Sequence, residues 1–160
     1  MLAPSRIRRF ALAGVGATTL AIISGGIVGA SACPGWPLCI DQLVAGGGLP
    51  AWLAIGHRAL VALAGLIALI AAVLAWRRSD LERIVRLTLL FAPLLLIIQS
   101  LIAGLLLTTG NAALADLTHL AGALLTLGVQ TAALAALTQP TPDSRLMGGR
   151  AARDTRRLSS

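Results

Sequence analysis

Four apolar stretches, each long enough to cross a lipid bilayer, constrain this 160-residue chain more than any other feature of its sequence. They run over residues 10–32, 52–76, 84–109 and 112–137. A helix needs about 20 residues to cross roughly 30 Å of hydrocarbon, and backbone groups in lipid must bond to one another. Hydrophobic residues make up 57% of the chain and charged residues only 12%, too apolar for an ordinary soluble domain. The sequence therefore predicts an all-α integral membrane protein, a four-transmembrane-helix bundle.

The arginines predict the orientation of these spans. All 13 basic residues are arginine, against 6 acidic residues, which gives a formal charge of +7. Apart from Arg58, they lie in the arm 1–9, in the connection after the second span together with the first residues of the third, and in the tail 139–160. Because positive residues favour the cytoplasmic side, we expect a multi-pass protein of the cell membrane with both termini and the middle connection cytoplasmic. The same pattern argues against nucleic-acid binding, because the arginines flank apolar spans and form no soluble basic face.

The two ends of the chain are predicted separately from the membrane domain, residues 10–138. The tail 139–160 is polar and broken by proline, which is typical of a disordered cytoplasmic extension. The first span has a second interpretation, because Ala30-Ser31-Ala32 resembles a signal-peptide cleavage site. Cleavage there would leave three spans and both histidines of the chain.

A weak internal repeat suggests two helical hairpins in tandem. Gly29 and Gly104 lie near the outer ends of the first and third spans, and His57 and His119 lie in the outer parts of the second and fourth. Two such hairpins would form a bundle with a pseudo-two-fold axis along the membrane normal. Bundles of this kind hold cofactors between side chains of facing helices.

His57 and His119 are the only histidines, and each lies about two turns inside its span. An ionisable side chain at that depth is costly and marks a functional site by default. Zinc usually takes four ligands, often including cysteine or carboxylate, and the neighbours of the two histidines do not supply the others, since Asp116, three residues before His119, lies closer to the interface. Haem iron needs only two axial ligands because the porphyrin supplies four nitrogens. The pair therefore favours a haem site, with histidines that only pack against neighbouring helices as the alternative.

Arg58, beside the first histidine, has two explanations. Its guanidinium can extend to the membrane interface, as charged side chains in spans commonly do. It can also pair with a haem propionate, which would direct the propionates outward.

Cys33 and Cys39 lie in an arginine-free loop that we expect on the external face, where disulfides persist. A plain structural disulfide is the favoured interpretation. Shaping of a loop over the haem mouth and a redox-labile pair remain open.

The motif Cys33-Pro34-Gly35-Trp36-Pro37-Leu38-Cys39, followed by His57-Arg58, resembles the haem A synthase family of cytochrome oxidase assembly proteins. Gln99, Gly104 and His119-Leu120 are similar to the same family. Typical members contain two four-helix halves, and residues 8–138 resemble one half. The resemblance implies an oxidoreductase that converts haem O to haem A by oxidising a porphyrin methyl group, with His57 and His119 as axial ligands of haem b, haem O or haem A.

The resemblance also implies partners, and one departure from it leaves a second function open. The expected partners are membrane lipid, haem, another copy or a second half-length subunit, a haem O-forming enzyme and an electron donor. The family's glutamate before the first histidine is Ala54 here, so no catalytic residue is assigned. The alternative is a non-enzymatic haem-binding or haem-delivery subunit of a respiratory assembly complex.

Overall fold

The computed structural model describes residues 4–28, 46 and 48–139, and nearly all of them are helical. The helices are α1 (Pro4–Val28), α3 (Gly48–Trp76), α4 (Arg83–Thr108) and α5 (Ala112–Thr138). All four are long and apolar enough to cross a membrane, and the described residues contain no strand. The prediction of an all-α multi-pass membrane protein with four long apolar helices is confirmed.

The helix ends follow local chemistry. The first helix begins at Pro4, earlier than expected, and so takes in much of the predicted N-terminal arm. Proline suits a first helical turn because its missing N–H would be unpaired there in any case. The turn between α4 and α5 passes through Gly110 at φ +76°, a backbone conformation that glycine adopts without steric cost. Asn111 then caps α5, and its side-chain oxygen accepts a hydrogen bond from the Leu114 N–H at 3.4 Å.

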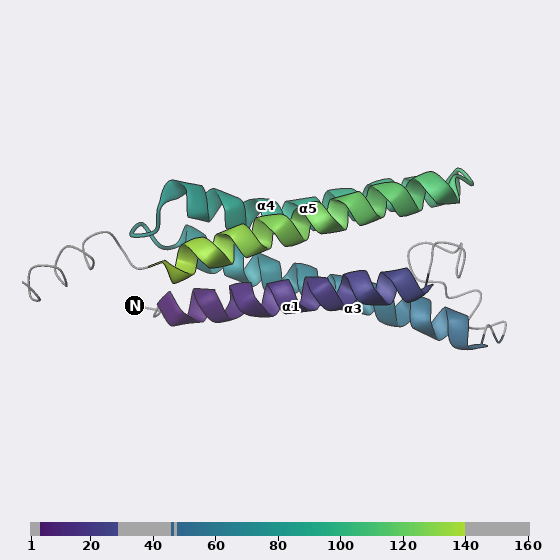
Figure 1. The fold of residues 1–160 in the computed structure, drawn as a ribbon, viewed down its shortest axis with the longest axis horizontal. Helices are drawn as coiled ribbons and strands as arrows, with labels where there is room; N and C mark the ends of the chain where they lie inside the picture. Colours follow the sequence, from purple (N-terminus) through teal and green to yellow (C-terminus); the bar gives the residue numbers. More distant parts are fainter. Residues whose placement is uncertain (1–3, 29–45, 47, 140–160) are drawn as a thin grey trace, which may run out of the picture.

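The four helices form an antiparallel ring (Figure 1). Helix α1 packs against α3 and α5, and α4 packs against α3 and α5. The pairs α1/α4 and α3/α5 are therefore the diagonals of the bundle. The start of α1 and the end of α5 lie at the same end of the bundle (Figure 1). Which side of the membrane that end faces, and whether the two hairpins are related by a pseudo-two-fold axis, remain predictions.

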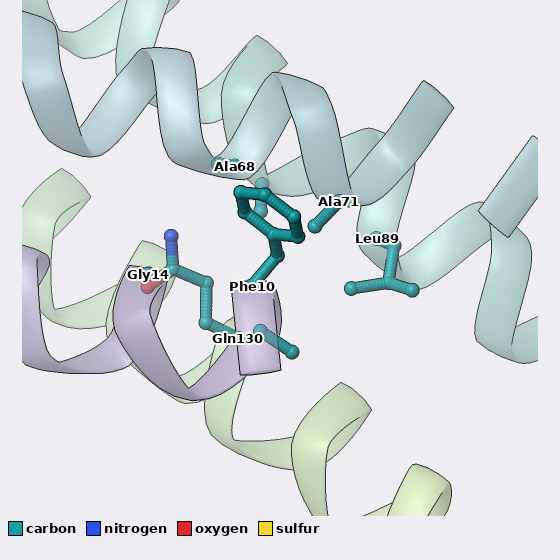
Figure 2. A pocket seen from close by; sticks show the side chains of 8 residues that line it. Phe10, Gly14, Ala68, Ala71, Leu89 and Gln130 are labelled. Carbon is teal, nitrogen blue, oxygen red and sulfur yellow. The ribbon is translucent and has the colours of Figure 1, made fainter. Parts of the chain in front are cut away.

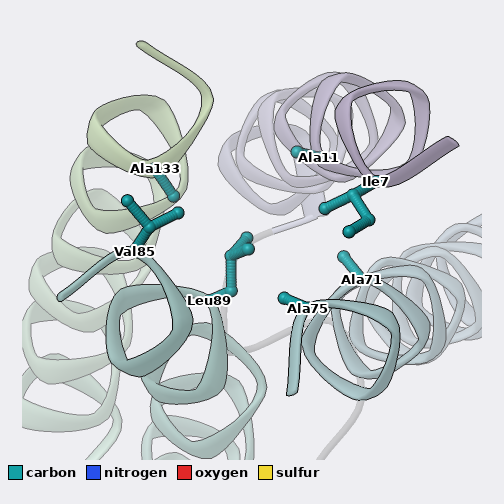
Figure 3. Packing of buried hydrophobic residues seen from close by; sticks show 7 residues of the cluster. All are labelled: Ile7, Ala11, Ala71, Ala75, Val85, Leu89 and Ala133. Carbon is teal, nitrogen blue, oxygen red and sulfur yellow. The ribbon is translucent and has the colours of Figure 1, made fainter. Parts of the chain in front are cut away.

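Small residues lie inside the bundle and large ones outside. The buried residues of α3 are all alanine, whereas Leu63, Leu66 and Leu69 on the same helix are about half exposed. This inverts the pattern of a soluble protein and suits lipid, where close approach of helices depends on small side chains. Near the start of α1, all four helices meet in a close-packed cluster (Figure 3): Ile7, Ala11, Ala71, Ala75, Val85, Leu89 and Ala133.

The bundle thus has two unlike halves. The half around this cluster is the packed half. A small cavity there, about 10 Å³, has Phe10 and Leu89 in its wall, and Gln130 is the one polar residue among the described residues that line it (Figure 2). That volume is about the minimum for one water molecule. The other half, where α1 ends and α3 begins, contains a much larger cavity and is called the cavity half.

Candidate functional site

A cavity of about 540 Å³ occupies the cavity half, and all four helices line it. This volume lies within the roughly 300–1,000 Å³ typical of small-molecule sites. On α3 the lining runs from Ala54 to Ala62, and on α5 from Ala115 to Ala123. His57 and His119 lie near the middle of these two segments. The cavity therefore extends about one turn above and below the histidines.

The two imidazoles face each other across a diagonal of the bundle, from α3 and α5. Their ring centroids are 6.1 Å apart and their planes are inclined by 79°. Two imidazole nitrogens bound to one metal at about 2.0 Å each would place the ring centroids roughly 6.3 Å apart. Because each axial ligand can rotate about its own metal–nitrogen bond, the inclination is compatible with a shared metal. The spacing therefore fits one iron between the rings.

Ser24 on α1 is hydrogen-bonded to His57. The Ser24 hydroxyl donates to the Ala21 carbonyl at 2.9 Å, and its oxygen lies 2.9 Å from His57 Nδ1. A serine hydroxyl has one proton to donate and can accept two hydrogen bonds. In the tautomer in which that proton goes to Ala21, His57 Nδ1–H donates to Ser24. This arrangement leaves His57 Nε2 with a lone pair for a metal, the relation found around metal-binding histidines.

Gly25, the next residue, makes room for the His57 ring. A Cβ at Gly25 would lie 2.9 Å from His57 Cε1 and 3.5 Å from both ring nitrogens. Any larger residue would push the ring out of its position, so glycine is required here by close approach.

His119 is held differently. Its Nδ1 is buried and has no hydrogen-bond partner among the described residues. Gln99 on α4 lies beside Gly122, one turn after His119, where an added Cβ would lie 2.7 Å from Gln99 Oε1. That oxygen also lacks a partner within the described part of the chain. Buried polar atoms without partners are costly unless a ligand or water meets them.

The charges at the cavity are few. Of its 22 described lining residues, only Arg58 and Asp116 carry a formal charge. The described residues contain no cluster of three or more histidine, cysteine, aspartate or glutamate side chains that could hold a bare metal ion. Two facing imidazoles in a largely apolar cavity instead match a metal that brings most of its own ligands, as haem does.

The structure brings most of the predicted site residues together and adds others. His57, Arg58, His119 and Ala54 line one cavity. Cys33 and Cys39 lie outside the described residues, so the predicted disulfide remains untested. Sequence reasoning missed Ser24 and Gly25, although a serine followed by two glycines in an apolar span signals a close helix contact.

The comparisons with known proteins give one informative relative. No family model matches the chain, and no solved structure is similar to it. The chain is 38% identical over 164 aligned residues to the protohaem IX farnesyltransferase of Chloroflexus aurantiacus. The match covers 99% of this chain. It spans only 28% of that relative's length.

This finding corrects the functional prediction. The assignment to the haem A synthase family, and with it haem A formation, cytochrome oxidase assembly and oxidoreductase chemistry, is wrong. The relative is named for transferring a farnesyl group to protohaem IX, not for oxidising a porphyrin methyl group. The alternative haem-delivery subunit is not supported either. The physical reason for the error is that two histidines in a helical bundle indicate a haem ligand but not the reaction that the haem undergoes.

Proposed function

We propose that this chain forms a membrane-embedded haem site that serves the farnesylation of protohaem, with His57 and His119 as the two axial ligands. The observation that carries the proposal is the facing imidazole pair, 6.1 Å apart, in the middle of a 540 Å³ cavity. The relative's name indicates that its substrate is protohaem IX and that its reaction is a farnesyl transfer. In this proposal the haem is a substrate, held by its iron.

Each residue around the haem has a separate task. Ser24 fixes His57 with Nε2 directed to the iron, and Gly25 admits the ring. Arg58 binds a propionate; because helical side chains lean toward the helix N-terminus, its guanidinium extends toward the end where α3 begins. The apolar remainder of the cavity buries the porphyrin face, which favours binding by about 25 cal/mol per Å² of apolar surface removed from water.

We propose that the farnesyl group is transferred at a site that this cavity does not provide by itself. A farnesyl donor with a phosphate leaving group needs cations, commonly magnesium held by carboxylates. Asp116 is the single carboxylate among the described cavity residues. We therefore propose that this chain forms the haem site of a farnesyltransferase whose donor site lies on further protein, which the greater length of the relative allows. Farnesyl transfer is not a redox reaction, so an electron donor is no longer part of the proposal.

The orientation and assembly belong to the same proposal. The positive-inside pattern favours cytoplasmic termini in the cell membrane and an external Cys33–Cys39 loop. In that orientation the cavity half faces outward. A second copy of the chain or a partner subunit would complete the assembly.

The test is the visible spectrum of the purified protein with haem added in detergent. The wild type should bind one haem with a low-spin, six-coordinate spectrum. His57→Ala and His119→Ala should each give a five-coordinate, high-spin spectrum and weaker binding. Gln130→Leu is the matched control, because this buried polar residue lies in the packed half and should leave the spectrum unchanged. Unchanged spectra in both histidine variants would contradict the ligand assignment.

The link to farnesylation needs a second measurement. In membranes that contain the remaining protein needed for the transfer, the wild-type chain should raise the yield of farnesylated haem from protohaem and a farnesyl donor. The two histidine variants should not raise it. Equal yields with the wild type and the variants would mean that the haem site has no part in the reaction. That result would refute the proposed link to farnesylation.

A further inference from the structure

The end of the bundle in the packed half carries a concentration of positive charge. Seven described arginines lie there, in the first turns of α1, directly after α3 and in the first turn of α4: Arg6, Arg8, Arg9, Arg77, Arg78, Arg83 and Arg86. The described acidic residues at this end are Asp80 and Glu82, and Asp80 is already paired with Arg78 at 2.6 Å. Two helices begin and two helices end here, so their dipoles largely cancel and the arginines determine the charge.

Arg86 is placed unlike most of the other arginines at this end. Leu89 and Pro93 follow it on α4 at steps of three and four residues, and both are buried. Arg86 therefore begins the stripe of α4 that faces the bundle. Its side chain is half-buried, whereas Arg83, one turn earlier, is exposed. Val85, the preceding residue, and Leu89 belong to the close-packed cluster (Figure 3), so packing limits the positions that the Arg86 side chain can take.

The charge of Arg86 is not met by the described part of the chain. Its Nε is buried and makes no hydrogen bond to any described residue. An arginine keeps its charge at any ordinary pH, and a half-buried cation is costly unless an anion or water meets it. Because Nε has almost no accessible surface, the two terminal nitrogens of the guanidinium are left to meet an anion. They carry four of its five N–H donors.

The depth of Arg86 favours one kind of anion. Trp76, the last residue of α3, is 58% exposed, and exposed tryptophan at the end of a span is typical of the membrane interface. The first turn of α4 lies at about this level, and Arg86 is about 4.5 Å further along the helix than Arg83. Ile84, in the same turn, is 64% exposed. An anion at this depth lies beside apolar side chains, as the phosphate of a phospholipid does.

From this placement we propose that the charged end of the bundle binds an anionic phospholipid, with the Arg86 guanidinium donating to its phosphate. Phosphate oxygens accept strong, charge-assisted hydrogen bonds from guanidinium. The exposed arginines around Arg86 favour an anionic headgroup over a zwitterionic one, because each adds attraction near the surface. Trp76 and Ile84 offer apolar surface to the acyl chains. This inference does not depend on the haem site, which lies in the other half of the bundle.

Lipid binding to the full chain in detergent, counted by native mass spectrometry over a range of lipid concentrations, provides the test. The wild type should bind phosphatidylglycerol more tightly than phosphatidylcholine by about tenfold or more. Arg86→Gln should lower the affinity for phosphatidylglycerol by about threefold to tenfold. Arg8→Gln is the matched control, because it removes the same charge from an exposed arginine at the same end, and it should lower that affinity by less than about twofold.

A second variant keeps the test decisive if Arg86→Gln does not fold, which circular dichroism checks. Arg86→Lys keeps the charge but loses the planar fork that can donate two parallel hydrogen bonds to phosphate. Its affinity for phosphatidylglycerol should lie below that of the wild type and above that of Arg86→Gln. Wild-type affinity in Arg86→Lys would overturn the guanidinium contact.

The remaining outcomes also decide the matter. Equal affinities of the wild type for the two lipids would overturn the inference. Equal losses in Arg8→Gln and Arg86→Gln would assign the preference to the overall charge of this end and overturn the role of Arg86. Inorganic phosphate that displaces the lipid at equal concentration would show that the site takes a free anion, which would overturn the lipid assignment. Haem binding by these variants should equal that of the wild type, so the two sites are tested separately.

Discussion

Gly25→Ala tests the histidine site most sharply, because the structure gives the size of the disturbance. The added Cβ would lie 2.9 Å from His57 Cε1, whereas ordinary carbon contacts are about 3.5–4.0 Å. The ring must therefore move by at least about half an ångström. Metal–ligand distances tolerate only about 0.2 Å, so the proposed bond between iron and His57 could not keep its length unless α1 also shifted.

The expected result is a loss of haem affinity by about tenfold to a hundredfold, the range seen when the surroundings of a metal ligand are changed. Haem titration followed at the Soret band measures it. Alanine is the better helix former by about 0.5–1 kcal/mol, so the variant should still fold, which circular dichroism checks. Gly16→Ala on the same helix meets no atom within 4 Å and should bind haem like the wild type. Wild-type affinity in Gly25→Ala would refute the close packing described for His57.

Three further predictions follow from other contacts. Gly122→Ala would place a Cβ 2.8 Å from the Cβ of Gln99, so we expect the free energy of unfolding to fall by about 1–3 kcal/mol; thermal melting measures it, and adding Gln99→Ala, which removes Oε1 but keeps the Cβ, should restore only part of the loss. Arg58→Met should weaken haem binding by roughly threefold to tenfold but leave the affinity for haem dimethyl ester unchanged; equal losses for both ligands would rule out a propionate contact. Between α3 and α4, the Arg78 guanidinium donates to Asp80 at 2.6 Å and lowers the pKa of that carboxyl. Any stability from this pair is present above the ordinary aspartate pKa and is lost as the pH falls through the lowered pKa; Arg78→Gln should raise the pKa of Asp80 in a carbon-13 NMR titration.

The architecture could be predicted from the sequence because a backbone in lipid can adopt few structures. Four apolar runs of sufficient length can only become helices when their backbones lie in hydrocarbon. The helix start at Pro4 could not be foreseen from hydropathy, since the basic residues near it end the apolar run without ending the helix. The ends of such helices are set by the backbone outside the membrane, which hydropathy does not describe.

The site was predicted in part. The pairing of His57 and His119 follows from equal depth on two helices that run the same way. The contributions of Ser24 and Gly25 could not be predicted, because α1 contains no residue of a type that commonly binds metal. Only the packing of α1 against α3 brings that serine within hydrogen-bond distance of the imidazole. The reaction was predicted wrongly, since the geometry of an iron site is shared by proteins that do different chemistry on the porphyrin.

The diagonal placement of the histidines has a consequence for how the protein is made. His57 belongs to the hairpin α1/α3 and His119 to the hairpin α4/α5, and the short connection from Arg77 to Glu82 joins them. Neither hairpin alone can provide both axial ligands. In the proposed haem site, binding of the iron therefore requires that both hairpins have entered the bilayer and packed together.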